Sequence, residues 1–329
     1  MNLTVIGAGA WGTALAITFS ARHKVTLWTR EDEVTQALLA ERENRQFFPG
    51  YRLPDGLAIA SDFSAALDSA ELLIIATPLV GFRPTLHRVR EAGSVKPLVW
   101  VCKGMEAGSA KLPHQIVAEE LGVHAVCGAL TGPSFAEEVA KGLPTAITLA
   151  ASDPAFARRT ALALHSARLR IYANDDVIGA EVGGAVKNVM AIATGICDGL
   201  GLGHNARAAL MTRGLAEMSR LGVALGGQAE TFMGLAGMGD LMLTCTGDLS
   251  RNRQVGLALA QGRKLAQILA ELGHVAEGVG TAREVARLAI ELGIEMPITQ
   301  AVDDVLYHDV AAAQAVDALL SRDPKSESA

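Results

Sequence analysis

Short, unbroken runs of apolar residues alternate with longer amphipathic segments through the first half of the chain. Unbroken apolar runs are typical of strands covered on both faces, and strands that alternate with helices build βαβ units around a parallel sheet. Helices are predicted over residues 11–21 and 31–42. Strands are predicted at residues 3–6, 25–28, 57–60, 72–76, 98–101, near 126, 146–149 and 169–172.

The pattern changes near Asn174, beyond which apolar residues keep helical spacing and no segment has the pattern of a strand. Asp175 or Asp176 is suited to cap the first of these helices, because its short carboxylate accepts from free backbone N–H groups. We therefore predict an α/β protein with two domains. Residues 1–175 would form a Rossmann-type domain, doubly wound around a mostly parallel sheet, and residues 176–329 an all-α domain.

Composition and charge narrow the class of protein. Hydrophobic residues make up 50% of the 329 residues and charged residues 19%, which is the balance of a folded chain. The formal net charge of −6 argues against a nucleic-acid partner bound through bulk charge. It does not argue against a small anionic substrate, since one or two basic side chains suffice to bind one.

The sequence also bears on location. The first predicted strand begins at about residue 2, which leaves no room for a signal peptide. No apolar run approaches the ~18–20 residues that span a bilayer. The four cysteines are widely spaced, as in proteins whose thiols stay reduced. We therefore predict a cytoplasmic protein without a membrane span.

The first predicted turn has the pattern of a dinucleotide site. Gly7, Gly9 and Gly12 form a GxGxxG motif that follows a strand and opens a helix, which is the context this motif requires. Gly7 permits the tight turn, Gly9 lets the backbone approach a pyrophosphate, and Gly12 lets helix and strand pack closely. Ala10 and Trp11 lie at the helix N-terminus, whose free N–H groups attract phosphate. The motif predicts bound NAD or NADP.

The end of the second predicted strand discriminates between the two cofactors. A carboxylate there binds the ribose 2′-hydroxyl of NAD, whereas an arginine accommodates the 2′-phosphate of NADP. Arg30 falls at the predicted strand end and favours NADP. Glu31 follows directly, so a strand one residue longer would favour NAD. A solvated charge at the start of a helix is the alternative for Arg30.

One lysine is isolated in an apolar helix. Residues 182–196 hold a single ionisable side chain, Lys187, with small residues around it at helical spacing. Lysine is seldom buried without a partner or a function, and burial lowers its pKa toward values useful for proton transfer. We predict that Lys187 exchanges a proton with the substrate, and that Asn188 hydrogen-bonds a substrate oxygen. The alternative is a lysine that extends along the helix into solvent.

Two further segments offer polar groups near the predicted sheet. Lys103 follows a buried strand, at the carboxyl edge where open α/β sheets bind ligands. Residues 131–136, which include Gly132, Ser134 and Ala136, predict a turn into a helix with hydroxyls and free N–H groups. Ordinary loop chemistry explains either segment equally well.

The second half offers an acidic turn and a basic segment. Asp240 lies in a predicted glycine-flanked turn, four residues before Thr244. Ser250, Arg251 and Asn252 make a suitable phosphate-binding set, because a guanidinium grips phosphate oxygens in bidentate fashion. A helix N-cap at Ser250 followed by solvated charges fits the same residues.

Metal ligands are not apparent in the sequence. The eight histidines form no pair at metal-ligand spacing, and His204 has no second ligand three or four residues away. We therefore predict no metal site.

Four long stretches together resemble bacterial NAD(P)-dependent glycerol-3-phosphate dehydrogenases, over roughly residues 2–320. They are GAGAWGTALA (7–16), TGPSFAEEVAKGLPTA (131–146), GGAVKNVMAIATGICDGLGLGHNARAALMTRGLAEMSRLG (183–222) and GLAGMGDLMLTCTGDLSRNRQVG (234–256). The resemblance implies reversible reduction of dihydroxyacetone phosphate to sn-glycerol 3-phosphate with NAD(P)H, at a site between a Rossmann-type and a helical domain. It also implies a homodimer and a supply of sn-glycerol 3-phosphate for phospholipid synthesis.

The same resemblance implies roles for individual residues. Lys187 would exchange the proton at the substrate C2 oxygen, and Arg251 and Asn252 would hold the substrate phosphate. The substrate contacts implied are Lys103, Gly132, Ser134, Lys187, Asn188, Asp240, Thr244, Ser250, Arg251 and Asn252. Besides the glycine loop, the cofactor contacts implied are Trp11, Arg30, Lys103, Ala136, Arg251, Val275 and Glu277.

Two other functions compete with this interpretation. A β-hydroxyacid-type dehydrogenase for a non-phosphorylated substrate would also join a Rossmann domain to a helical one, but Arg251 argues for a phosphate. A non-catalytic NADP sensor would need the glycine loop but neither Lys187 nor Arg251.

Overall fold

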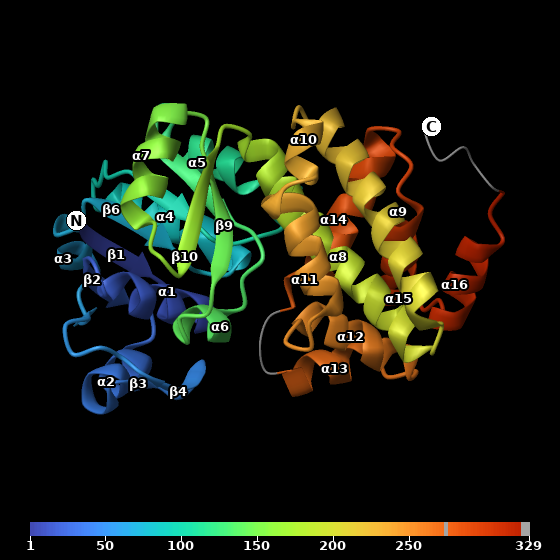
Figure 1. Cartoon of the computed structure of the whole chain (residues 1–329), viewed down its shortest axis with the longest axis horizontal. Helices are drawn as coiled ribbons and strands as arrows, with labels where there is room; N and C mark the ends of the chain where they lie inside the picture. The colour runs from blue at the N-terminus through green and yellow to red at the C-terminus, as the bar shows by residue number, and fades with distance from the viewer. Residues whose placement is uncertain (273–275, 324–329) are drawn as a thin grey trace.

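The computed structural model describes residues 1–272 and 276–323 of the chain. A sheet layered with helices occupies one side of the molecule, and a bundle of helices occupies the other (Figure 1). The sheet comes from the first half of the sequence and the bundle from the second, so the predicted fold class is confirmed.

Eight strands form the main sheet, in the order β10-β9-β8-β7-β6-β1-β2-β5. All neighbouring strands run parallel except β8 and β9. The strands are β1 (Asn2–Ile6), β2 (Lys24–Trp28), β5 (Ala58–Ala60), β6 (Leu72–Ile75), β7 (Leu98–Trp100), β8 (Cys127–Thr131), β9 (Thr145–Ala150) and β10 (Leu169–Asn174). The chain moves from β1 to β2 on one side and later returns to β6 on the other, and ligands bind at such a reversal of strand order.

Helices cover both faces of this sheet. Leu72 and Ile74 belong to one apolar cluster, with residues of α1, α2 and α7, whereas Leu73 and Ile75 belong to another, with residues of α3, α4 and α5. Burial on both faces explains why the strands lack polar alternation. The helices are α1 (Ala10–Ser20), α2 (Asp32–Glu41), α3 (Phe63–Asp68), α4 (Leu79–Glu91), α5 (Pro113–Leu121), α6 (Ala136–Ala140) and α7 (Pro154–Leu164).

A small hairpin, which the sequence pattern did not predict, follows α2. Its antiparallel strands are β3 (Glu43–Asn44) and β4 (Phe48–Arg52). The first has only two residues, both polar, and the second contains proline and glycine, so neither has the apolar run of a core strand. In Figure 1 the hairpin lies beside α2, away from the main sheet.

The second half is built around α8 (Val177–Gly199), which Asp176 caps through a hydrogen bond from Gly179 N to its Oδ1 at 2.8 Å. Gly195 and Gly256 let α8 and α12 approach closely, because a Cβ on either would lie 2.1 Å from a carbonyl oxygen of the other helix. The other elements are α9 (Gly203–Ala224), α10 (Ala229–Phe232), η1 (Leu235–Gly239), α11 (Asp240–Thr246), α12 (Arg251–Ala260), α13 (Leu265–Leu272), α14 (Glu277–Glu291), α15 (Pro297–Tyr307) and α16 (Ala312–Leu320).

By length and composition alone, helix α8 could cross a membrane, although Glu181, Lys187 and Asp198 interrupt its apolar residues. Of its most apolar window, 94% is buried inside the protein. Neighbouring helices bury the apolar surface of α8, and its place in the centre of the bundle explains its composition.

Candidate active site

The glycine loop between β1 and α1 has the geometry that its motif predicts. Gly7 has a φ of 113°, and a Cβ there would lie 2.8 Å from the carbonyl carbon of Ala76, just past β6. A Cβ on Gly12 would lie 2.0 Å from the carbonyl oxygen of Gly7. A Cβ on Gly9, by contrast, would meet no heavy atom of the described residues within 4 Å. The loop is therefore packed tightly behind Gly7 and Gly12 and open at Gly9, where a pyrophosphate would approach.

Asn44 of the hairpin stabilises this loop through hydrogen bonds. The buried side chain donates from Nδ2 to the carbonyl oxygen of Ala8 at 2.7 Å and to Oγ1 of Thr13 at 2.8 Å. Its Oδ1 accepts from Phe47 N at 3.2 Å. These hydrogen bonds fix the backbone at Ala8, directly before the N-terminus of α1. The free N–H groups of that helix terminus are then positioned to bind an anion. Asn44 was not predicted as part of the site, because a single asparagine in a short polar strand has no distinctive sequence pattern.

The end of β2 presents both of the side chains that bear on the choice of cofactor. Arg30 is exposed, and its Nη2 pairs with Oε1 of Glu31 at 3.1 Å. Thr29 donates to Oε2 of Glu31 at 2.6 Å, and this hydrogen bond is the main cause that lowers the pKa of Glu31. The strand itself ends at Trp28. A cationic and an anionic side chain thus stand together where the ribose of a dinucleotide would lie.

At the junction of the two halves, two lysines share one carboxylate. Lys103 Nζ donates to Oδ2 of Asp240 at 2.7 Å, and Lys187 Nζ donates to Oδ1 of the same residue. Lys187 also donates to Oγ1 of Thr244 at 2.9 Å, while Thr244 donates to the Asp240 carbonyl oxygen at 2.6 Å. Lys187 and Asp240 are 6% and 1% exposed, so Lys187 does not extend into solvent.

Close backbone packing brings this cluster together. A Cβ on Gly183 of α8 would lie 2.4 Å from the carbonyl oxygen of Ala236 in η1, the element that leads into Asp240. A Cβ on Gly184 would lie 3.3 Å from Cγ of Lys103, whose stem therefore runs along α8. The predicted turn around Asp240 is wrong, because η1 is a π-helix that continues directly into α11. Such π-helical turns are rare and frequent at functional sites.

Burial and charge set the protonation of the cluster. Burial lowers the pKa of Lys187 to about 7, the Asp240 carboxylate opposes this shift, and the Lys103 ammonium adds to it. Burial disfavours ionised Asp240, but the ammonium groups of Lys103 and Lys187 outweigh it and lower the pKa of this carboxyl. Asp240 is therefore a fixed anion at neutral pH, and Lys187 lies close to the balance between ammonium and amine. A side chain in this state can exchange a proton.

A chain of asparagines links the cluster to the start of α12. Asn188 Oδ1 accepts from Nδ2 of Asn252 at 2.9 Å, and Oδ1 of Asn252 accepts from Gly278 N at 3.0 Å. Ser250 caps α12, since its Oγ accepts from Arg253 N at 3.3 Å. The N-cap given as the alternative for Ser250 is therefore present. The first turn of α12 is held against the residue next to Lys187.

Arg251 is the basic side chain of this turn that stays free. It is exposed, and within the described ranges no hydrogen bond or ion pair engages its guanidinium. The charge of Arg251 nevertheless acts on Glu277 at the start of α14. Burial raises the pKa of Glu277, and the positive charges of Arg251 and Lys103 oppose this rise. Arg253, by contrast, pairs with Asp198 at 2.8 Å. A free guanidinium at a helix N-terminus is suited to bind a phosphate.

The turn predicted at residues 131–136 joins the end of β8 to the start of α6. Gly132 has a φ of 134°, and a Cβ there would lie 3.0 Å from Cα of Ile147. Ser134 donates to the Gly132 carbonyl oxygen at 3.0 Å, and Ala136 begins the helix. The carboxyl end of β8 lies beside the lysine cluster, because a Cβ on Gly184 would meet Oγ1 of Thr131 at 3.3 Å.

Two hydroxyls at the carboxyl edge of the sheet support the fit of a cofactor. Oγ1 of Thr77, after β6, and Oγ1 of Thr131, at the end of β8, are buried without a partner among the described residues. Buried hydroxyls usually have a hydrogen-bond partner, and a polar molecule bound along this edge would supply one for each of these two. The open Gly9 lies after β1 on the same edge. These residues fit a nicotinamide dinucleotide.

Two predictions are not decided by this geometry. Val275 lies outside the described residues. Buried Asp303, half-buried Asp304 and exposed His308 hold possible metal-ligating atoms within 4.8 Å of one another, an arrangement that by itself does not show an ion. The absence of a metal site therefore stays a prediction.

Comparison with known proteins agrees with the geometry. A family model described as NAD-dependent glycerol-3-phosphate dehydrogenase N-terminus matches residues 2–157, and one described as the C-terminus of the same enzyme matches residues 176–317. A protein of Dechloromonas aromatica named glycerol-3-phosphate dehydrogenase (NAD(P)+) is 67% identical over 327 residues, covering 99% of each chain. Its namesake in Aromatoleum aromaticum is 61% identical over 99% of this chain and 100% of its own. The crystal structure of glycerol-3-phosphate dehydrogenase from Coxiella burnetii matches with a TM-score of 0.93 and 43% identity, over 98% of this chain and 99% of that one.

Proposed function

Because the chain belongs to the NAD-dependent glycerol-3-phosphate dehydrogenase family, we propose that it reversibly reduces dihydroxyacetone phosphate to sn-glycerol 3-phosphate. The chain is an oxidoreductase that uses NAD or NADP. The observation that carries the mechanism is Lys187, buried and bonded to Asp240 at the junction of the two halves.

The cofactor supplies the hydride when it is bound, and the protein provides its binding site. The N–H groups after Gly9 would face the pyrophosphate, with Ala10, Trp11 and Gly12 in the first turn of α1. Arg30 would meet a 2′-phosphate and Glu31 a 2′-hydroxyl, so we propose that both cofactors are used and that NADP is preferred. Ala136, Val275 and Glu277 are further proposed cofactor contacts.

Lys187 would hold and move the proton of the reaction. Hydride addition to a ketone leaves negative charge on the C2 oxygen, and the Lys187 ammonium would protonate that oxygen. Lys103 would stabilise the same charge electrostatically. Asp240 orients both lysines through separate oxygens, and Thr244 fixes the Lys187 side chain from the other side. In the reverse direction the neutral amine of Lys187 would accept the proton.

Arg251 would select a phosphorylated substrate. Its free guanidinium and the N–H groups at the start of α12 offer a phosphate site next to Asn188. Asn252 would complete this site, with Ser250 as its cap. Gly132 and Ser134 would approach the substrate from the sheet edge. This arrangement disfavours a non-phosphorylated hydroxy acid and a non-catalytic sensor.

The wider setting also belongs to the proposal. We place the domain boundary between residues 175 and 176, since the last strand ends at Asn174 and α8 begins at Val177. We further propose a cytoplasmic homodimer that supplies sn-glycerol 3-phosphate for phospholipid synthesis. Sedimentation equilibrium of the purified protein tests the oligomeric state.

The experiment is to mix the protein with NADPH or NADH and follow the loss of nicotinamide absorbance. Dihydroxyacetone phosphate should be reduced much faster than unphosphorylated dihydroxyacetone. Arg251→Gln should raise KM for the phosphorylated ketone, whereas Arg253→Lys, at an arginine already held by Asp198, should leave KM nearly unchanged. No oxidation of either cofactor by the phosphorylated ketone would contradict the proposed reaction.

A further inference from the structure

Lys103 lies just before a turn at residues 106–111, which is closed by hydrogen bonds from Glu106 N to the Lys111 carbonyl oxygen and from Ala110 N to the Glu106 carbonyl oxygen, both at 2.9 Å. Residues 101–112 connect β7 to α5 without helix or strand. Gly104, Gly108 and Ala110 all have positive φ, at 118°, 81° and 53°. For Ala110 this conformation is unfavourable, because a side chain in the left-handed region is strained. Lys103 lies outside this hydrogen-bonded turn, so its position also depends on the contacts that hold the turn against the neighbouring helices.

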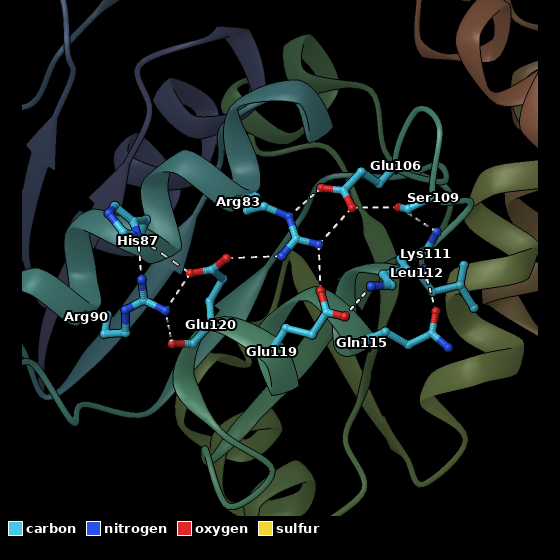
Figure 2. Close-up of polar contacts among 10 residues, drawn as sticks. All are labelled: Arg83, His87, Arg90, Glu106, Ser109, Lys111, Leu112, Gln115, Glu119 and Glu120. Atoms are coloured by element: carbon cyan, nitrogen blue, oxygen red, sulfur yellow. Dashed lines mark hydrogen bonds and ion pairs between the residues drawn. The ribbon is translucent and has the colours of Figure 1, made fainter.

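Arg83 of α4 forms one set of these contacts (Figure 2). Its Nε donates to Oε1 of Glu106 at 2.7 Å and its Nη2 to Oε2 at 2.8 Å, a bidentate pair only three residues from Lys103. The same guanidinium reaches Glu119 at 2.8 Å and Glu120 at 3.0 Å, both on α5. One side chain thus joins α4, the segment and α5, as Figure 2 shows.

The far side of the segment is fixed by α14, in the other half of the molecule. Gly108 N donates to Oε1 of Glu284 at 2.8 Å. A Cβ on Gly104 would lie 2.7 Å from Oγ1 of Thr281. With Arg83 on one side and α14 on the other, the segment is held across the junction at which Lys103 meets Asp240.

We propose that Arg83 is a positioning residue that acts through Glu106 to hold Lys103 against Asp240. The catalytic consequence rests on the proposed function, but the placement of Lys103 does not. The guanidinium geometry supports this role, because two parallel N–H bonds to one carboxylate fix orientation as well as distance. The Arg83 side chain is 30% exposed and that of Glu106 22%, so the pair is more constrained than an ordinary surface ion pair.

Arg90 offers a matched control. It lies on the same helix and pairs with Oε2 of Glu120 at 2.9 Å, but no bond joins it to residues 101–112. Arg83→Ala should lower kcat/KM for dihydroxyacetone phosphate by about 10²-fold, the typical cost of a misplaced catalytic group, whereas Arg90→Ala should change it little. Arg83→Lys should recover only part of the loss, since an ammonium cannot form the bidentate pair.

The pH profile separates positioning from general destabilisation. The titratable groups that interact with Lys187 are Asp240 and Cys245 of α11, Glu277 of α14, and Lys103. Only Lys103 is carried on the segment. Moving its ammonium away would remove a repulsion and raise the pKa of Lys187, so the profile of Arg83→Ala should shift to higher pH. That of Arg90→Ala should not shift.

A second measurement does not depend on the reaction. Acetic anhydride modifies free amines, and mass spectrometry reports the rate at Lys103, which is 17% exposed and paired in the wild type. The rate should rise in Arg83→Ala and stay at the wild-type value in Arg90→Ala. If Arg83→Ala does not fold, Arg83→Lys decides the question by the same readouts. Unchanged Lys103 acylation and an unchanged pH profile would overturn the inference, whereas an inactive wild type would count against the proposed function alone.

Discussion

The glycine loop and the lysine cluster are built in opposite ways. The loop is local: Gly7, Gly9 and Gly12 lie within six consecutive residues from the end of β1 to the first turn of α1, and its shape follows from the absence of their side chains. The cluster is long-range, since Lys103, Lys187 and Asp240 come from a sheet-edge segment, α8 and α11. A local motif is therefore sensitive to added volume, whereas an assembled cluster is sensitive to lost charge.

The largest expected effect is on the lysine cluster. Lys187→Met should lower kcat by about 10²–10⁴-fold, because it removes the group that exchanges the proton while conserving much of the volume. Asp240 would keep Lys103 as its partner. NADPH binding, measured by nicotinamide fluorescence, should stay close to wild type because the glycine loop is untouched. A matching loss of NADPH affinity would show that the two regions are not separable.

The pH dependence should differ between the regions as well. The pKa of Lys187 is lowered to about 7, so its protonated form is present below that pH and is lost above it. The kcat/KM for ketone reduction should fall about tenfold for each pH unit above the pKa, and that for alcohol oxidation should rise through the same region.

Cofactor binding at the loop is the reference for this profile. The contacts at the loop are backbone N–H groups, which do not titrate, so the Kd of NADPH should change much less between about pH 6 and about pH 9 than kcat/KM does. A flat profile for ketone reduction over the same range would assign the proton to another group.

How far the sequence predicts each region follows from the same distinction. The glycine loop can be predicted from the sequence because its three glycines and flanking apolar runs are adjacent in the chain. Lys187 is conspicuous because it is the single ionisable side chain of residues 182–196, but its pairing with Asp240 cannot be predicted from two segments about fifty residues apart. Asp240 itself was placed in a turn, because Gly237 and Gly239 are typical of turns. Packing of η1 against Gly183 holds those glycines in a π-helix instead.

Supporting contacts were the least predictable. Asn44 matters only because the hairpin places it behind the glycine loop, and Arg83 only because α4 places it beside Glu106. Both residue types are common on protein surfaces, so neither is conspicuous in a sequence. The apolar pattern predicts the elements, whereas the polar contacts that align the site depend on how those elements pack.

Within the loop, two alanine substitutions should separate folding from binding. Gly12→Ala places a Cβ 2.0 Å from the Gly7 carbonyl oxygen, so it should destabilise the protein by at least about 1–3 kcal/mol. Gly9 has a φ of −68° and open space at its Cβ, so Gly9→Ala should fold normally and weaken NADPH binding. Thermal unfolding and fluorescence titration measure the two effects. Equal Tm values for both variants would contradict the division of roles between these glycines.

The smallest expected effect is at Arg30, where the loop meets the choice of cofactor. Its guanidinium is 77% exposed and pairs with Glu31 next to it, so solvent screens its charge and the pair contributes about 1 kcal/mol or less. Arg30→Ala should therefore raise KM for NADPH by only about fivefold, as expected for an exposed contact of ~1 kcal/mol, and lower KM for NADH by a smaller factor. Removing the pairing should also free the Glu31 carboxylate, held by Thr29, to meet the 2′-hydroxyl of NAD. Both changes lower the preference for NADPH over NADH, which steady-state kinetics measure directly. If the preference does not change, Arg30 is a solvated charge at the start of α2, and the discrimination between cofactors lies elsewhere along the edge of the sheet.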